Sequence, residues 1–140
     1  MSTPLLQLEN LSKHYGSVRA PIVAVNGVNL QLEAGRNLAI VGESGSGKST
    51  LARLVMALEP PTQGQVRFQG QDLNTLGPRA LRETRRHFQM VFQDPYASLD
   101  PRMRILQTVT EPLNTLPGMS GPALREQAAE MLSQVGLRSS

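Results

Sequence analysis

The chain has 140 residues, of which 39% are hydrophobic and 18% are charged, and its formal net charge is +3. This composition is too apolar for a disordered chain, and no stretch approaches the roughly 20 apolar residues that a transmembrane helix needs. The absence of cysteine excludes disulfides and a cysteine nucleophile within these residues. The first residues lack the basic segment of a signal peptide, so we expect a cytoplasmic chain.

Two strands precede the most distinctive part of the sequence. Residues Leu5–Tyr15 and Val28–Leu32 alternate between apolar and polar side chains, which is typical of half-buried strands. Residues Glu33–Arg36 then predict a turn. Leu38–Val41 is a short continuous apolar run, which predicts a strand buried on both faces.

A glycine-rich segment follows, and after it an amphipathic helix is expected. The apolar residues of this helix recur at i, i+3, i+4 and i+7, and they are Leu51, Leu54, Val55 and Leu58. Because the residue before a proline disfavours helical geometry, we expect Pro60-Pro61 to end the helix.

The rest of the chain changes from mixed structure to helices. The patterns predict, in order, a strand at Gln65–Phe68, a turn at Gln69-Gly70, a helix at Pro78–Arg86 and a strand at Phe88–Phe92. Two helices follow, one over about 103–113 and one from near Pro122, with Pro117-Gly118 between them. The sequence therefore predicts an α/β core and a helical portion from about residue 100.

The glycine-rich segment fits G-x-x-x-x-G-K-[ST], the pattern of a phosphate-binding loop, at every fixed position of 42–49. Glycines let successive N–H groups turn inward toward phosphate oxygens, and the following helix directs its positive end to the same place. We expect Lys48 to reach the β- and γ-phosphates, the Ser49 hydroxyl to bind Mg²⁺, and Thr50 to add a hydrogen bond. The cofactor-binding residues predicted here are Gly42, Ser44, Gly45, Ser46, Gly47, Lys48, Ser49 and Thr50. The alternative is a chance Gly/Ser-rich turn, and the motif alone does not separate an ATPase from a kinase or a GTPase.

Two further segments narrow the class. Val91–Pro95 reads VFQDP and Leu11–Gly16 reads LSKHYG, and together with the loop they resemble the nucleotide-binding subunit of an ATP-binding-cassette (ABC) transporter. The resemblance implies a P-loop NTPase core with an antiparallel β portion over residues 1–100, and the start of a helical subdomain over 101–140. It implies that Gln93, in the Q-loop, approaches Mg²⁺ and the attacking water, and that Tyr15 stacks on the adenine of ATP.

One group within this family is indicated by the sequence around the Q-loop. Ser98–Arg102 reads SLDPR and Arg85–Met90 reads RRHFQM, and both resemble importers of dipeptides, oligopeptides, nickel and glutathione. The resemblance implies a subunit that couples ATP binding and hydrolysis to uptake of peptides or a related small solute. Its implied partners are transmembrane permease subunits, a second ATP-binding subunit in a head-to-tail dimer and, indirectly, a periplasmic or extracellular solute-binding protein. It implies a location on the inner face of the cell membrane.

The same family carries an LSGGQ signature, an apolar strand ending in Asp-Glu (Walker B) and a switch histidine, and none of these is found among the 140 residues. We therefore expect a truncated, N-terminal portion that binds ATP and Mg²⁺ without turning ATP over. Since strands that flank the phosphate-loop strand in this family lie further along the chain, we also expect a marginal, partly molten core.

Two alternatives remain open at this stage. One is an ABC-type ATPase that acts on nucleic acid or the ribosome, and the other is a non-enzymatic ATP-binding remnant. Arg79, Arg82 and Arg86 share one helix face, but a solvated face is the favoured interpretation and no nucleic acid partner is expected. His14 and His87 lack ligand spacing and are interpreted as surface residues.

Overall fold

A computed structural model describes residues 3–94, 99–115 and 118–137 of the chain. Contacts divide it into two compact units, residues 1–90 and 91–140, and each is described here by itself. Pro95, Ser98 and Pro117, which entered the sequence predictions, lie outside the described residues.

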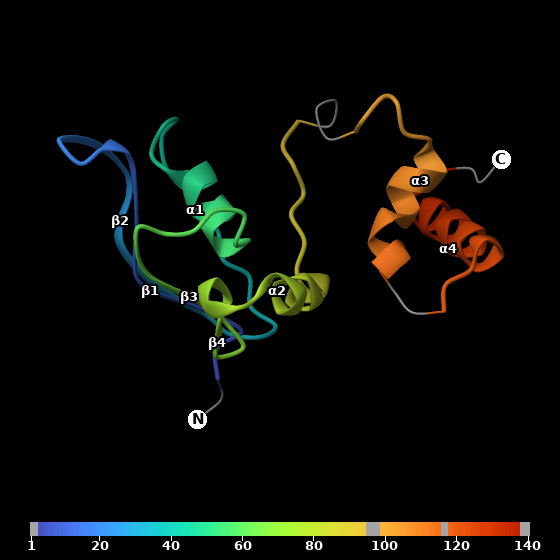
Figure 1. Ribbon diagram of the computed structural model, residues 1–140, viewed down its shortest axis with the longest axis horizontal. Coiled ribbons are helices and arrows are strands. Elements are labelled where there is room, and N and C mark those ends of the chain that lie inside the picture. Colours follow the sequence, from blue (N-terminus) through green and yellow to red (C-terminus); the bar gives the residue numbers. More distant parts are fainter. Residues whose placement is uncertain (1–2, 95–98, 116–117, 138–140) are drawn as a thin grey trace. The chain divides into compact units, whose positions relative to one another are not determined.

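The first unit is built on an antiparallel sheet of four strands in the order β2-β1-β3-β4 (Figure 1). The strands are β1 (Leu6–Ser17), β2 (Ala20–Leu32), β3 (Gln63–Phe68) and β4 (Gln71–Asp72). The strands predicted at 5–15, 28–32 and 65–68 are thus confirmed, and β2 begins eight residues before the prediction. The turn between β3 and β4 has positive φ at both central residues, Gln69 (50°) and Gly70 (82°), as a tight hairpin turn requires.

A bulge in β1 changes which side chains reach the core. Asn10 has a φ of 47°, and the pairing of β1 with β2 shifts between Leu8 and Leu11. Strict alternation from Leu8 would turn Asn10 inward, but the bulge buries Leu8 and Leu11 and leaves Asn10 exposed. The Asn10 N–H donates to Asn29 Oδ1 at 2.9 Å, so a side chain of β2 satisfies the irregular backbone.

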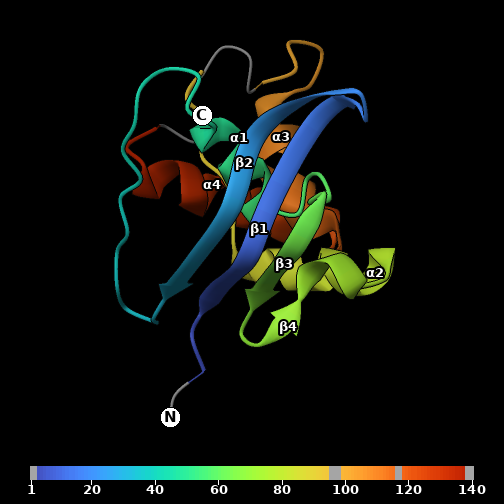
Figure 2. The same cartoon turned by 90° about the vertical axis from the view of Figure 1, so that its left-hand side faces the viewer.

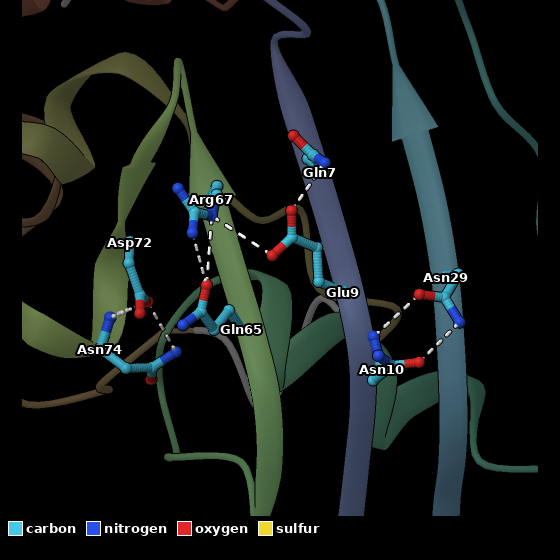
Figure 3. Close-up of polar contacts among 8 residues, drawn as sticks. All are labelled: Gln7, Glu9, Asn10, Asn29, Gln65, Arg67, Asp72 and Asn74. Atoms are coloured by element: carbon cyan, nitrogen blue, oxygen red, sulfur yellow. Dashed lines mark hydrogen bonds and ion pairs between the residues drawn. The ribbon is translucent and has the colours of Figure 1, made fainter.

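The two faces of the sheet differ sharply. One face meets helix α1 (Lys48–Val55) in a core of eight buried residues, which are Leu8, Leu11, Val25, Leu51, Leu54, Val66, Phe68 and Leu73. The other face carries a polar network in which Glu9 accepts from Gln7 and pairs with Arg67 at 3.5 Å (Figure 3). The fold is therefore a sheet covered on one side.

The remaining helical turns of this unit lie at the edge of the same core. A 3-10 turn at Leu73–Thr75 is followed by α2 (Pro78–Thr84) and a second 3-10 turn at Arg85–His87, which confirms the helix predicted from Pro78. Phe88 then packs edge-on against Phe68, with ring centroids 5.1 Å apart.

Two predicted strands are wrong. Leu38–Val41 lies in an irregular loop over residues 33–47, with Leu38 and Val41 exposed by 49% and 93% (Figure 2). A buried strand needs a hydrogen-bonded neighbour for its backbone groups, and no strand in the described part of the chain pairs with this run. Phe88–Phe92 forms no strand for the same reason, and Phe92 is exposed.

The end of α1 also differs from the prediction. The helix stops at Val55, five residues before Pro60, because Ala57 adopts a positive φ of 50°. The Leu58 N–H donates to the Arg53 carbonyl and the Ala57 N–H to the Leu54 carbonyl, both at 2.9 Å, which is a Schellman C-cap. Glycine is the residue that usually takes this left-handed position. Because alanine takes it here, the sequence lacks the usual signal of a helix end.

The second unit contains helices, as predicted. These are α3 (Ile105–Thr110), a 3-10 turn at Glu111–Thr115 and α4 (Gly121–Gln134). Thr110 and Ala128 are its buried residues within the described ranges. Met131 in α4 and Val135 directly after it are exposed. Over residues 3–94, 99–115 and 118–137, no helix is long and apolar enough to cross a membrane.

Candidate nucleotide-binding site

The loop before α1 has the backbone of an anion site. Gly45 and Gly47 have φ values of 80° and 91°, and α1 begins directly afterwards at Lys48. The Leu51 N–H donates to the Gly47 carbonyl at 2.8 Å, so the N–H groups of 48–50 precede the first intrahelical bond and have no acceptor within the helix. Unsatisfied N–H groups and the positive end of the helix dipole favour a negative ligand at this point.

Glycine is required at one position of the loop, Gly47, and the space beside Gly42 is also tight. A Cβ atom at Gly47 would overlap the Ala24 carbonyl oxygen of β2, and the φ of 91° would be strained for any other residue. A Cβ atom at Gly42 would lie 2.7 Å from Ser46 Oγ. The first contact shows that the loop is seated against β2, so the sheet fixes the position of the loop.

The loop wraps around the ammonium group of Lys48. Its Nζ donates to the Gly42 carbonyl at 2.7 Å, to the Glu43 carbonyl and to Ser46 Oγ at 3.2 Å. The Ser46 N–H closes the loop through a bond to the Glu43 carbonyl at 3.2 Å. A positive charge therefore lies inside a ring of glycine-rich backbone, an arrangement that suits phosphate oxygens.

Ser49 and Thr50 follow Lys48 in the first turn of α1, Ser49 exposed and Thr50 half-buried. The described residues hold no group of three or more His, Asp or Glu side chains that could enclose a metal ion. A Ser hydroxyl is a hard oxygen donor of the kind Mg²⁺ accepts, and Mg²⁺ commonly completes its shell with water and substrate phosphates. Ser49 is thus chemically suited to the predicted role.

Tyr15 lies near the β1–β2 hairpin end and is 36% exposed. Its hydroxyl donates to Glu59 Oε2 at 2.8 Å, and the Lys13 ammonium lies 5.2 Å from the ring centroid. Lys13 also pairs with Glu59 at 3.4 Å and donates to the Pro60 carbonyl at 2.7 Å. These contacts tie the tip of the hairpin to the segment that follows α1.

Both groups of the Tyr15–Glu59 contact have shifted pKa values. The hydrogen bond to Glu59 is the main cause that raises the pKa of the Tyr15 phenol, and the same bond lowers the pKa of the Glu59 carboxyl. The Thr50 hydroxyl and the Arg53 guanidinium act on Tyr15 in the opposite direction. Tyr15 therefore lies close to α1, the helix that carries Lys48 and Ser49.

Gln93 is placed in the second unit, in a bend where its side chain is exposed. Tyr15 and the loop residues thus lie in the first unit, and Gln93 lies in the second. The predicted approach of Gln93 to Mg²⁺ and water stays a prediction.

A hollow of about 390 Å³ lies on the inner side of the loop, between β2 and the start of α1. Its wall is largely apolar and includes Val23, Val25, Ile40 and Leu51, with Gly42 and Ser46–Lys48 at one side. Apolar walls do not suit phosphate, so we assign the phosphate site to the loop itself and not to this hollow.

Sequence reasoning missed Lys13 and Glu59 as neighbours of Tyr15. The contact of Lys13 with Tyr15 could have been predicted, because residues two apart on a strand share a face. The contact of Glu59 could not have been predicted, since Glu59 lies in the irregular segment after a helix whose predicted end was too far along the chain.

A glycine-rich loop that encloses a lysine ammonium at the start of a helix defines a P-loop protein, the class that binds nucleoside triphosphates. The family model of ABC transporters matches residues 25–140, and the chain belongs to this family.

Similar proteins agree with this assignment. The chain is 44% identical to the dipeptide transport ATP-binding protein DppF of Escherichia coli, covering 99% of this chain and 43% of that protein. It is 44% identical to the di/tripeptide transport ATP-binding protein DppF of Pseudomonas aeruginosa, and 45% identical to a probable peptide ABC transporter ATP-binding protein of Sinorhizobium fredii. The chain thus spans less than half the length of these curated relatives.

Solved structures confirm the fold class. The ATP-binding cassette MJ0796, in a dimeric post-hydrolysis state bound to ADP and Pi, matches with a TM-score of 0.80 and 32% identity. The match covers 95% of this chain and 58% of that one. A second dimeric structure of MJ0796 matches with a TM-score of 0.79. The expected ABC ATPase core with an antiparallel β portion is therefore correct.

Proposed function

We propose that the chain is the ATP-gripping part of the ATP-binding subunit of an ABC importer for peptides or a related small solute. The observation that carries the proposal is the Lys48 ammonium enclosed by the loop carbonyls at the start of α1. The relatives are peptide transport ATP-binding proteins, and they supply the substrate class of the proposal.

The geometry supports a specific division of labour. Phosphate oxygens of ATP would replace the Gly42 and Glu43 carbonyls around the Lys48 ammonium and accept from the N–H groups of 48–50. Ser49 would hold Mg²⁺, which neutralises phosphate charge when bound. Tyr15, exposed beside α1, would stack on the adenine ring. Ser44, Gly45, Ser46 and Gly47 would shape the loop around the phosphates.

Hydrolysis is a separate part of the proposal. Phosphoryl transfer needs a phosphate cradle, a metal ion and a group that positions water, and these must act together. The loop would supply the phosphate cradle, and Ser49 would hold the metal ion. Gln93 is the proposed contact to water and Mg²⁺. Since the 140 residues contain no LSGGQ and no strand that ends in Asp-Glu, we propose binding without turnover by this chain alone.

The partners and the location follow from the same assignment. We propose permease subunits in the membrane, a second ATP-binding subunit in a head-to-tail dimer, and a site on the inner face of the membrane. A solute-binding protein would act through the permease. The dimeric state of the MJ0796 cassette supports the dimer. We propose no nucleic acid partner, and the ion pair at 2.9 Å between Glu83 of α2 and Arg86 of the following 3-10 turn supports a solvated arginine-rich face.

Substitution of Lys48 tests the proposal. Lys48→Ala should weaken binding of ATP and of inorganic triphosphate by about tenfold or more, because it removes the charge-assisted bonds at the phosphates. Arg19→Ala is the matched control, since it removes one positive charge at the exposed β1–β2 turn. Calorimetric titration of the 140-residue chain with magnesium chloride present gives both affinities. Equal affinity of the parent chain and Lys48→Ala for ATP would contradict the assignment of the phosphate site. Hydrolysis of ATP by the parent chain that is lost in Lys48→Ala would contradict the proposal of binding without turnover.

A further inference from the structure

The Tyr15 ring is held by two groups that lie outside the phosphate loop. Glu59 Oε2 accepts from the Tyr15 hydroxyl at 2.8 Å. The Lys13 ammonium lies 5.2 Å from the ring centroid and is itself fixed by Glu59 at 3.4 Å and by the Pro60 carbonyl at 2.7 Å. The Lys13 and Glu59 side chains are only 13% and 21% exposed, whereas Tyr15 is 36% exposed. The two charged groups are thus packed, and the ring between them stays open to a ligand.

We propose that Glu59 is a positioning residue that, together with Lys13, holds Tyr15 as a stacking platform with one usable face. The inference rests on the proposed function, in which Tyr15 stacks on the base of ATP. The bond to Glu59 fixes the hydroxyl end of the ring, so the ring loses little further freedom when a base binds. Lys13 covers one face through a cation–π contact, so the base stacks on the other.

The same geometry sets what Tyr15 reads in the nucleotide. A phenol has one hydrogen to donate, and Glu59 already accepts it. The ring therefore offers a π surface and no donor to the edge of a base. Stacking alone tolerates every base, since every base has a π face. Tyr15 accordingly contributes affinity for nucleotides over free triphosphate and little discrimination of adenine from guanine.

The test compares ATP with inorganic triphosphate, which lacks a base. Both are titrated into the 140-residue chain, with magnesium chloride present, and into variants of Tyr15 and Glu59. Glu59→Ala should weaken ATP binding roughly threefold to tenfold, the factor expected when one side chain must be ordered on binding, and leave triphosphate binding unchanged. Tyr15→Phe should do the same, and Tyr15→Phe/Glu59→Ala should add nothing further. Glu59→Gln, whose amide oxygen still accepts, should keep most of the affinity.

The controls separate this inference from the proposed function. Glu9→Gln removes a different paired carboxylate, that of Glu9 in β1, which pairs with Arg67, and it should change neither affinity. If the parent chain binds ATP no better than triphosphate, Tyr15 does not act as a platform for the base, and the inference is overturned. A parent chain that prefers ATP, with Glu59→Ala equally selective, would overturn the role of Glu59 alone. Equal weakening of ATP and triphosphate by Glu59→Ala would mean a structural role, which also overturns the inference.

A second measurement tests the contact without a ligand. The chain has no tryptophan and two tyrosines, so Tyr96→Phe leaves Tyr15 as its sole phenol. The absorbance titration of Tyr15 in that background should move to lower pH on Glu59→Ala, because the acceptor that holds its proton is gone. The shift should be smaller for Glu59→Gln, since its amide accepts but carries no charge. An unchanged titration in Glu59→Ala would contradict the contact.

Discussion

The strands of the sheet alternate apolar and polar side chains and bury the apolar ones, whereas the run Leu38–Val41 is apolar throughout and exposed. Leu8, Leu11 and Val66 of β1 and β3 are at most 2% exposed, whereas Ile40 and Val41 of the run are exposed by 50% and 93%. The difference lies in their partners. β1 meets β2 across a two-residue turn, while a buried parallel strand needs neighbours that arrive through long crossovers. Apolar composition therefore predicts burial only where the partner is also present.

The largest expected effect tests this contrast through one matched pair. Leu54 is fully buried in the core below the sheet, so Leu54→Ala should lower the free energy of unfolding by about 2–5 kcal/mol through lost burial and a cavity. Val41→Ala removes methyl groups that already face solvent, and its effect should stay within about 0.5 kcal/mol. Urea unfolding followed by circular dichroism measures both values.

Two outcomes would break the comparison. A large loss of stability in Val41→Ala would mean that the run 38–41 is packed in solution. The absence of any cooperative transition in the parent chain would instead confirm the marginal, partly molten core that the sequence predicts. A sharp transition would contradict that prediction.

The bulge that shapes the sheet gives the next effect. Gly64 has a φ of 84°, and a Cβ atom there would overlap the carbonyl oxygens of Glu9 and Asn10 in β1. Gly64→Ala should therefore cost about 2–4 kcal/mol, from left-handed strain and from displaced backbone. Gly77→Ala is the control, because Gly77 has a φ of −66° and open space at its Cβ position. Thermal unfolding of both variants measures the difference, and equal melting temperatures would contradict the close approach of β1 and β3.

Much of this fold could be predicted because its signals are local. Alternation marked β1 and the second half of β2, the Gln69-Gly70 pair marked the turn after β3, and the spacing from Leu51 marked α1. The loop of 42–49 was equally readable, since a phosphate site built from backbone N–H groups needs glycine at fixed positions. The structure places the Gly42 and Glu43 carbonyls around the Lys48 ammonium, and phosphate binding by the loop stays a prediction.

The rest depends on contacts that no short pattern contains. The bulge at Asn10 is supported by Asn29, which is 19 residues away, and the end of α1 rests on an alanine in a left-handed position. Glu59 reaches Tyr15 across 44 residues. Each of these involves a polar or small residue whose role is set by a distant partner, so the sequence left them unmarked.

A buried hydroxyl in the sheet should give a smaller effect. Ser12 is 4% exposed, and its Oγ accepts from the Gly27 N–H at 2.8 Å where the pairing of β1 and β2 is irregular. Ser12→Ala leaves that N–H without its acceptor and should cost about 1–2 kcal/mol. Ser17→Ala, at the exposed end of the same strand, should be neutral. Urea unfolding of the two variants distinguishes them, and equal stability would contradict the buried bond.

The smallest effect concerns the exposed end of the hairpin and depends on pH. Because Glu59 raises the pKa of Tyr15, the contribution of the contact is fully present below the ordinary tyrosine pKa of about 10 and is lost as the pH rises through the folded-state value. Because Tyr15 lowers the pKa of Glu59, the contribution is present above the ordinary glutamate pKa of about 4.3 and is lost as the pH falls through the folded-state value.

Thermal melts of the parent chain and Tyr15→Phe isolate this contact. The Lys13–Glu59 ion pair and the nearby Arg53 are present in both chains, so their effects cancel in the difference. The difference in melting temperature should be small and constant between about pH 5 and 9, and should shrink on either side. A difference that persists unchanged at pH 3 would show that the phenol is stabilised by something other than the Glu59 carboxylate. The hairpin end would then resemble the buried part of the sheet, whose hydrogen bonds join groups that do not titrate.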